Sequence, residues 1–470
     1  MAFSELTFLF LFFPIALLLH TLMPRPGKNV ILLITSLVFF AWGTPEYLIL
    51  MLCSIGFNYF TGMEMADLLD EGNDRRAKFV LISAVVVNLL LLGFFKYYGF
   101  LVDNINAILG TSITARQLPM PIGVSFFTFT LLSYLYDVYR DKAPVAENIF
   151  DFALYVTFFP KLVSGPIVQY KDMEEQIWER SVNAAKIGSG CRLFIIGLAK
   201  KILISGPIGT TFYAVTALPA DQISVVTGWL GAITYALMLY FDFSGYSDMA
   251  IGLAQMFGFK FEKNFDYPYI SSSITEFWRR WHISLGAWFR DYVYIPLGGS
   301  RAGTGATIRN LCIVWLLTGI WHGASWNFIF WGVYYGGLLL LEKFVFKNIL
   351  EHIPLVIKRI FTLFLVLIGW VFFFSTSLTG ALTWLGRMFG IGAAGLLDGT
   401  AKYYLGSSAI ILIIGAVSAY PLGANLGNKL LKKKSKLPIY LSVVWFAVLL
   451  IACIAGMMSS TYSTFLYFQF

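Results

Sequence analysis

Charged residues are scarce in this chain of 470 residues: Asp, Glu, Lys and Arg make up 13% of it, whereas apolar residues make up 58% and aromatic residues 17%. The mean hydropathy is +0.73. This composition excludes a water-soluble globular protein. Apolar runs that can cross or nearly cross a hydrocarbon layer as helices, which takes about 20 residues, occupy 6–23, 79–95, 226–243, 360–374, 409–420 and 437–454. Because strong β-barrel alternation is absent, we predict an all-α polytopic membrane protein.

Cysteine is also rare. The four cysteines, Cys53, Cys191, Cys312 and Cys453, are dispersed in apolar segments and form no Cys-x-x-Cys pair. The pattern indicates neither a disulfide framework nor a thiolate metal site, and we expect buried, inert thiols. The chain also lacks a His-x-x-x-His or zincin pattern, so no metal site is predicted.

The positive charges are few, but they exceed the negative ones and leave a formal net charge of +8. They lie in short loops beside apolar runs, where membrane topology and anionic lipids explain them and nucleic acid is not needed. Basic loops at 25–28, 75–78 and 140–142 are predicted to face the cytoplasm, and the basic run 432–436 precedes the last apolar run. No basic region precedes the first run, so we expect a retained helix rather than a signal peptide. Both termini are predicted outside.

The chain is predicted to form a single integral membrane domain with three regions. Residues 1–118 and 347–470 read as plain spanning helices, whereas Pro and Gly repeatedly break the apolar pattern of residues 119–346. Broken helices at membrane depth are tolerated only where protein or water satisfies the freed backbone groups, so such a region usually lines a cavity. We therefore expect the functional site between residues 119 and 346.

Two of only four histidines, His282 and His322, lie in this central region among tryptophans. An imidazole titrates near neutral pH and is costly to place among hydrocarbon groups without partners. No charged residue occurs between Arg309 and Glu342, so His322 is predicted to lie deep. The alternative is a core histidine whose hydrogen bonds are simply satisfied.

The surroundings of His322 predict a close contact. On a continuous helix Thr318, His322 and Trp326 would stack at i,i+4 spacing. Gly319 and Gly323 would allow another backbone or a ligand to come close.

The stretch around His282 is predicted to form one helix from 273 to 294, capped by the serines at 271–273 and stabilised by a Glu276–Arg280 pair. One face would carry Trp278, Trp281, His282, Leu285 and Trp288 or Phe289. Arginines at positions 279, 280 and 290 place the helix at the cytoplasmic interface. It is either the wall of a funnel that meets an anionic cytosolic ligand or an interfacial anchor, and the sequence leaves both open.

Asp242 and Asp248 follow the apolar run 226–243. Either carboxylate could orient an imidazole or bind a cation. Capping of a helix end is the interpretation that we favour.

These motifs are similar to those of a known family. The chain resembles the membrane-bound O-acyltransferase (MBOAT) family, and within it the branch of alginate O-acetylation (AlgI-like) proteins. The matching segments cover most of the chain in order: 120–129 (MPIGVSFFTF), 133–140 (SYLYDVYR), 158–161 (FFPK), 164–166 (SGP), 241–249 (FDFSGYSDM), 267–299, 321–326 (WHGASW) and the terminal FQF.

The resemblance implies a ring of about 10–12 transmembrane helices, with re-entrant or interfacial helices around a central funnel. It implies that His322 is the active-site histidine and His282 a second histidine that polarises the thioester oxygen or holds the donor. We expect no bound cofactor, with acetyl-CoA as the donor substrate. The other expected substrate-binding residues are Arg279, Arg280, Arg290, Trp278, Trp281, Trp326 and Asn327.

The implied function is transfer of an acetyl group from a cytosolic thioester across the bacterial cytoplasmic (inner) membrane, for O-acetylation of an extracytoplasmic polysaccharide that resembles alginate. The resemblance also implies a periplasmic or extracellular acetyltransferase of the SGNH type, which receives the acetyl group. Since we find no appended soluble domain and no Gly-x-Ser-x-Gly elbow in the sequence, we expect that enzyme to be a separate partner, besides membrane lipids. The alternatives are peptidoglycan O-acetylation, DltB-like D-alanylation of teichoic acid, or a polysaccharide or solute transporter.

Overall fold

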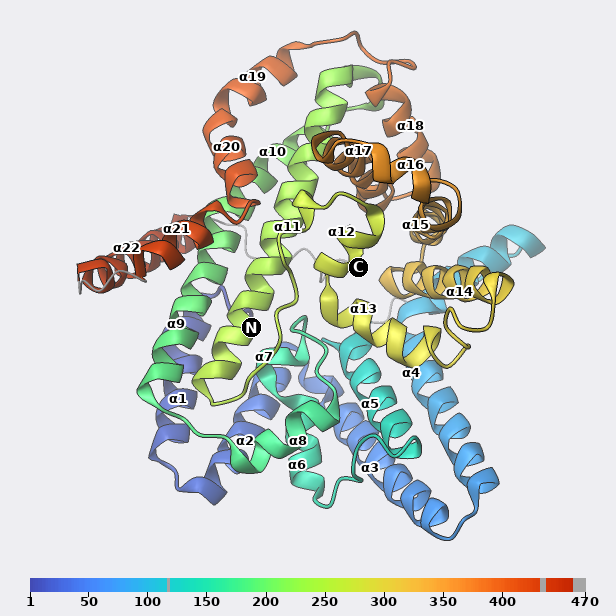
Figure 1. The fold of residues 1–470 in the computed structure, drawn as a ribbon, viewed down its shortest axis with the longest axis vertical. Coiled ribbons are helices and arrows are strands. Elements are labelled where there is room, and N and C mark those ends of the chain that lie inside the picture. Colours follow the sequence, from blue (N-terminus) through green and yellow to red (C-terminus); the bar gives the residue numbers. More distant parts are fainter. Residues whose placement is uncertain (116–118, 432–436, 460–470) are drawn as a thin grey trace. The chain divides into compact units, whose positions relative to one another are not determined.

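Helices make up all the regular structure of the computed structural model, which describes residues 1–115, 119–431 and 437–459 (Figure 1). No strand occurs in these ranges, which confirms the all-α class. The basic run 432–436 and the terminal Phe-Gln-Phe lie outside the described residues. The chain divides into two compact units, residues 1–194 with 249–262 and residues 195–248 with 263–470. Helices α9 (Ala184–Ala199) and α11 (Val225–Met256) each contribute residues to both units.

The first unit is a bundle around an aromatic core. Its helices are α1 (Phe13–Leu22), α2 (Arg25–Gly43), α3 (Leu48–Asp70), α4 (Asp74–Leu109), α5 (Val124–Tyr139), α6 (Ile149–Thr157), α7 (Phe159–Leu162) and α8 (Tyr170–Glu179). Tyr134 on α5 is fully buried, and its ring centroid lies 4.5 Å from that of Phe152 and 5.1 Å from that of Tyr170. A Cβ on Gly62 of α3 would lie 2.5 Å from the Tyr134 hydroxyl. The glycine therefore lets α3 and α5 approach closely.

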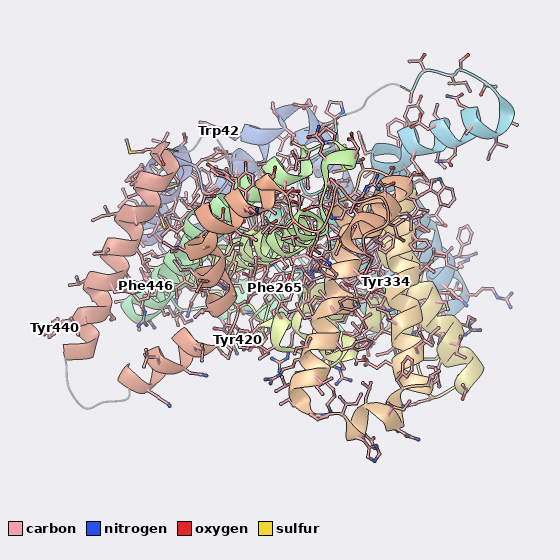
Figure 2. The ribbon with its side chains drawn as sticks, turned by 90° about the horizontal axis from the view of Figure 1, so that it is seen from above. Trp42, Phe265, Tyr334, Tyr420, Tyr440 and Phe446 are labelled. Atoms are coloured by element: carbon pink, nitrogen blue, oxygen red, sulfur yellow. The ribbon has the colours of Figure 1, made fainter. Side chains whose placement is uncertain are left out.

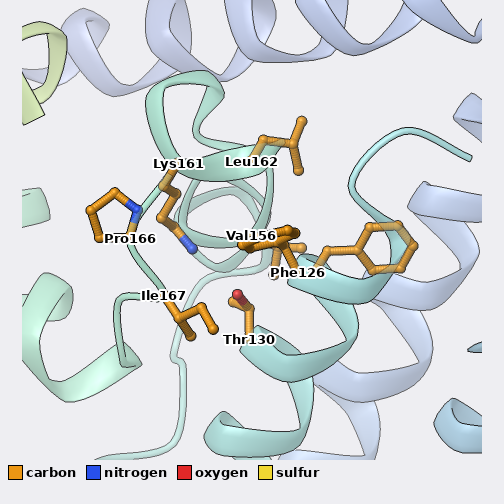
Figure 3. Close-up of a pocket in the computed structure, with 8 residues that line it drawn as sticks. Phe126, Thr130, Val156, Lys161, Leu162, Pro166 and Ile167 are labelled. Carbon is orange, nitrogen blue, oxygen red and sulfur yellow. The ribbon is translucent and has the colours of Figure 1, made fainter. Parts of the chain in front are cut away.

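The first unit also contains a buried lysine. Lys161 on α7 is 4% exposed, and its Nζ lies 4.2 Å from the centroid of the Tyr155 ring. Figure 3 shows the amine directed into a small pocket whose wall includes Thr130, Pro166 and Ile167. Burial lowers the pKa of Lys161 to about 7, because the apolar surroundings disfavour the ammonium form.

We expect Lys161→Met to raise the thermal midpoint Tm in detergent, and to raise it more at pH 7 than at pH 10. The unfolded chain keeps its lysine protonated up to about its ordinary pKa of 10.5, whereas the folded chain releases that proton above about 7. The wild-type protein therefore gains stability as the pH rises through this window, by about 1.4 kcal/mol for each unit of pKa difference. Thermal unfolding of both proteins at the two pH values measures the effect. An exposed control, Lys78→Met, should show no such dependence, and an equal shift for Lys161→Met at both pH values would contradict the explanation.

The second unit contains most of the region with broken helices and the carboxyl-terminal helices. After α9 come a π-helical turn, η3 (Lys200–Ser205), and α10 (Gly206–Thr216), and η6 (Arg290–Tyr294) is a second π-helical turn. The remaining helices are α12 (Ile274–Arg280), α13 (Ile283–Phe289), α14 (Thr304–His322), α15 (Trp326–Phe344), α16 (Lys347–His352), α17 (Leu355–Phe374), α18 (Leu378–Met388), α19 (Gly399–Ser407), α20 (Ala409–Ser418), α21 (Leu422–Leu431) and α22 (Leu437–Ser459).

Six helices of the described chain are long and apolar enough to cross a membrane, or seven if the bent pair α19 and α20 forms one span. The six are Arg25–Gly43, Pro45–Asp70, Asp74–Leu109, Val225–Met256, Leu355–Phe374 and Tyr440–Ser459. Helices α14 and α15, each of 19 residues, do not meet this criterion, so the ring of 10–12 spans stays a prediction. In α22 only 6% of the apolar window is buried, and side chains such as Tyr440 are exposed (Figure 2). This exposure suits a lipid-facing helix.

Two expectations about polar and thiol groups were wrong. Asp242 and Asp248 do not cap a helix end, because α11 continues to Met256; Asp242 pairs with Lys201, and Asp248 lies 2.6 Å from Lys200 Nζ. Cys53 and Cys312 are exposed rather than buried, because both lie on outward-facing sides of apolar helices. Burial holds for Cys453.

Candidate active site

The segment around His282 is not the single helix predicted for 273–294. Helix α12 begins at the Ser273 cap, whose hydroxyl accepts from the Glu276 amide at 3.0 Å, and it ends at Arg280. His282 has a φ of +47°, in the left-handed region, and α13 starts after it. The cap and the Glu276–Arg280 pair, at 2.9 Å, are confirmed.

The break has a tertiary cause. The loop before α12 folds back onto the end of that helix: the Asp266 amide donates to the Arg280 carbonyl at 2.9 Å, and the Ile283 amide donates to the Asn264 carbonyl at 2.9 Å. These bonds take the groups that a continuous helix would use between residues four apart. At the other end, the Glu342 carboxylate of α15 accepts from the amides of Ile274 and Thr275 at 2.7 and 3.1 Å. Both ends of α12 are therefore held by other segments.

The imidazole of His282 is 2% exposed and lies among aromatic rings. Its centroid is 4.8 Å from that of Phe243 and 6.3 Å from that of Trp321. Nδ1 lies 3.2 Å from Asn264 Oδ1, while Nε2 makes no hydrogen bond to any described residue. Burial lowers the pKa of His282 to about 3, so the ring is neutral at physiological pH.

His322 is the last residue of α14 and is 7% exposed. Its ring centroid lies 4.8 Å from that of Trp331, 4.9 Å from that of Trp321 and 5.0 Å from that of Phe373. The expected i,i+4 stacking with Trp326 is wrong, because the helix ends at His322 and Trp326 begins α15. The intervening Gly323 is extended, with a φ of −170°.

The close approach expected beside His322 is confirmed. A Cβ on Gly319 would lie 2.5 Å from the Phe328 carbonyl oxygen, and one on Gly332 would lie 2.3 Å from the Trp315 carbonyl oxygen. A Cβ on Gly323 would lie 2.3 Å from the Phe328 ring. Backbone contact between α14 and α15 at this distance is possible only without side chains. The glycines thus set the position of the helix that ends in His322.

The two histidines share one neighbour, since both rings contact Trp321. Around them lies a continuous set of aromatic contacts, which we call the tryptophan cluster: Trp278, Trp281, Trp315, Trp321, Trp331 and Trp370. Trp281 lies 4.9 Å from Trp370, and Trp370 lies 5.5 Å from Phe373, which contacts His322. The structure therefore brings together His282, His322, Trp278 and Trp281, which the sequence placed at the site.

The three arginines expected at the site differ in their surroundings. Arg279 is exposed. Arg280 pairs with Glu276 at 2.9 Å and with Asp266 at 3.4 Å, and Arg290 pairs with Asp291 at 2.7 Å. The carboxylates partly neutralise the last two. Arg279 is therefore the arginine best suited to meet an anionic ligand.

Trp326 and Asn327, which were also expected to bind the substrate, lie at the start of α15. Trp326 is 57% exposed, whereas Asn327 is 1% exposed and donates its amide hydrogens to the carbonyls of Phe372 and Ser375 at 3.1 and 2.8 Å. Asn327 thus ties the start of α15 to the end of α17. Tyr334, labelled in Figure 2, adds a second tie by donating to the Leu365 carbonyl at 2.8 Å. Within the described ranges, no group of three or more His, Cys, Asp or Glu residues is arranged to hold a metal ion.

Two neighbours of the site were not predicted. Asn264 lies in the interrupted central region 119–346 without being singled out by its sequence neighbours, and Phe373 lies in the plain apolar run 360–374. A polar residue just before an aromatic-rich break was the available signal for Asn264. Nothing local distinguishes Phe373 from the other residues of its helix.

This combination of helical fold and buried histidines agrees with the family comparison. Residues 141–379 match the model of MBOAT, the membrane-bound O-acyltransferase family. The chain belongs to this family, and it is a multi-pass membrane protein with O-acyltransferase activity.

Individual relatives narrow the comparison. A protein described as "Probable alginate O-acetylase AlgI" from Pseudomonas putida is 38% identical over the full length of both chains. The protein with that description from Pseudomonas aeruginosa is 43% identical over 83% of this chain and 75% of its own length. A "Peptidoglycan O-acetyltransferase" from Helicobacter pylori is 34% identical, over 84% of this chain and 81% of its own.

Proposed function

We propose that the protein takes an acetyl group from acetyl-CoA and passes it on for O-acetylation of an extracytoplasmic polysaccharide of the alginate type. The observation that carries the proposal is the pair of buried histidines around Trp321 in a chain of the acyltransferase family. The similarity to the AlgI proteins over most of the chain favours alginate over peptidoglycan.

In this proposal His322 is the general base. A neutral imidazole accepts the proton of the acceptor hydroxyl as its oxygen attacks the thioester carbonyl. The new C–O bond forms, the C–S bond breaks, and the departing thiolate receives the proton. Positioned proton transfer of this kind contributes about 10²–10⁴ in rate. The tryptophan cluster excludes water, which limits wasteful hydrolysis of the thioester.

The donor is proposed to enter from the cytoplasm. Its phosphates would meet Arg279, whose guanidinium is exposed on α12 within the same segment as His282. Only the slim pantetheine arm and the acetyl group would then reach the buried histidines. Arg280 and Arg290 would also attract the phosphates of the donor electrostatically. Their attraction would be weaker than that of Arg279, because each is paired with a carboxylate.

The delivery step is proposed to need a separate protein. The chain would lie in the bacterial inner membrane with both termini outside, and an acetyltransferase of the SGNH type on the outer face would receive the acetyl group.

Purified protein in lipid vesicles with labelled acetyl-CoA tests the donor. We expect the purified protein to release free CoA. When membranes that contain the partner are added, we expect labelled acetyl on an alginate oligosaccharide. A carrier protein loaded with D-alanine as a thioester is tested in place of acetyl-CoA. Use of this donor instead of acetyl-CoA would indicate the D-alanylation type of activity. Flux of an oligosaccharide across the vesicle membrane without consumption of thioester would show that the protein acts as a transporter and not as an acyltransferase.

A further inference from the structure

The side chain of Asn264 has only one orientation that satisfies its neighbours. Its Oδ1 lies 3.1 Å from the backbone nitrogen of Ser284 and 3.0 Å from the Ser284 hydroxyl. A backbone N–H can only donate, so the atom facing it is the carbonyl oxygen and not the amide nitrogen. The Nδ2 on the other side donates to the Ser247 hydroxyl at 3.1 Å. Asn264 is 1% exposed, which holds this arrangement away from water.

This orientation determines the proton position on His282. The same oxygen, Asn264 Oδ1, lies 3.2 Å from His282 Nδ1. Since a carbonyl oxygen only accepts, Nδ1 must carry the hydrogen. The ring is buried and neutral, so it holds one proton, and Nε2 is left with a lone pair. Isolated neutral imidazole favours the opposite tautomer, with the hydrogen on Nε2.

We propose that Asn264 is a positioning residue that holds His282 in the Nδ1–H tautomer, so that Nε2 accepts a hydrogen bond from an N–H or O–H group of a substrate. The inference rests on the proposed acyl transfer for the identity of that substrate. It excludes one of the two roles that the sequence left open, polarisation of the thioester oxygen. A lone pair at Nε2 cannot polarise the thioester oxygen, which needs a hydrogen-bond donor. His282 therefore holds a substrate group that carries a hydrogen.

Asn264 also holds the backbone turn at His282. His282 adopts a left-handed φ of +47° that is uncommon for a residue with a Cβ. The Ile283 amide donates to the Asn264 backbone carbonyl, and the Ser284 amide donates to its side chain. Asn264 thus stabilises both the backbone turn that positions the imidazole of His282 and the hydrogen on the Nδ1 of that ring. Phe243 and Trp321 keep the ring in contact with apolar groups, and Nε2 makes no bond to a described residue.

The direct test is the ¹⁵N spectrum of histidine-labelled protein in lipid at pH 7. With only four histidines in the chain, comparison with His282→Gln assigns the two nitrogens of His282. We expect a protonated Nδ1 and an unprotonated Nε2, and in Asn264→Ala a shift toward the Nε2–H form. A protonated Nε2 in the wild-type protein would overturn the proposal. The spectrum needs no activity, so it remains decisive even if acetyl-CoA is not the donor.

Kinetics give the second test. We expect Asn264→Ala to lower kcat/KM for acetyl transfer by about 10- to 100-fold, by analogy with metal-bound histidines, where removing the hydrogen-bond partner that orients the ring has this effect. Asn264→Asp keeps the acceptor oxygen and should restore most of the rate. Asn88→Ala is a matched control, because Asn88 is another buried asparagine (3% exposed) that pairs with Asn58 in the first unit. It should lose a comparable amount of stability and keep its kcat/KM, and equal rates for Asn264→Ala and the wild type would overturn the proposal.

Short thioesters identify the group that Nε2 meets. S-acetyl-N-acetylcysteamine keeps one amide N–H of the pantetheine arm, and S-methyl thioacetate has none. If the amide is the partner, His282→Ala lowers the rate with the first compound and not with the second. If the acceptor hydroxyl is the partner, the rate falls with both. If His282→Ala turns over both compounds as fast as the wild type, Nε2 has no role in binding the substrate. The same result would still show acyl transfer, so it would contradict the role of Nε2 and not the proposed function.

Discussion

Replacement of His322 by alanine is expected to abolish acyl transfer, with a loss of about 10²–10⁴ in rate, while the protein is still expressed and inserted in the membrane. His322 is 7% exposed, ends α14, and contacts Trp321, Trp331 and Phe373. The variant removes the proposed base and leaves these rings in place. Polymer acetylation in cells and thioester consumption by purified protein measure the loss.

His352→Ala is the matched control for this experiment. His352 is exposed at the end of α16, where its Nδ1 contacts the Asn348 carbonyl, so its removal should leave acetylation unchanged. A His322→Ala protein that acetylates as well as the wild type would remove His322 from the mechanism. A variant that fails to insert would be replaced by His322→Gln, which keeps more of the side-chain volume.

The second large effect is expected from Gly332→Ala. The added Cβ would lie 2.3 Å from the Trp315 carbonyl oxygen and 3.2 Å from the Gly319 Cα, both of them backbone atoms. Because neither can yield as a flexible side chain can, α14 and α15 must separate, at a cost of about 1–3 kcal/mol for overpacking. We expect a lower Tm in detergent and a loss of activity, since α14 carries His322 at its end.

Gly337→Ala on the same helix separates this packing effect from helix propensity. A Cβ at Gly337 meets nothing within 4 Å, and replacing a glycine inside a helix by alanine stabilises it by up to about 1 kcal/mol. The two variants should therefore shift Tm in opposite directions. A stabilising Gly332→Ala would mean that the approach of α14 and α15 is not as tight as the structure has it.

Much of the candidate site could be read from local patterns. The Ser273 cap and the Glu276–Arg280 pair follow from rules that act within one helical turn, and both are present. The close approach at Gly319 follows from the missing side chain. The presence of breaks between 119 and 346 was also predictable, since Pro and Gly interrupt helices locally.

The places where prediction failed involve residues far apart in the sequence. The helix expected across 273–294 is divided at His282 because residues 264–266 bind the backbone at 280–283. The aspartates expected at a helix end lie within α11, where Lys200 and Lys201 pair with them. Hydrophobic periodicity carries no information about such partners, so neither outcome was accessible from the segment itself.

The sequence alone determined that the protein is helical and that it lies in a membrane, and it predicted that two histidines in its broken central region are the groups suited to chemistry. Composition and helical spacing suffice for these conclusions because they depend on transfer to lipid and on neighbours within a turn. Only the tertiary structure decided that His282 sits in a left-handed turn with its Nδ1 against Asn264, and that Trp321 contacts both histidines. Hydrogen bonds and ring contacts between distant segments fix these features, and they exist only once those segments have packed together.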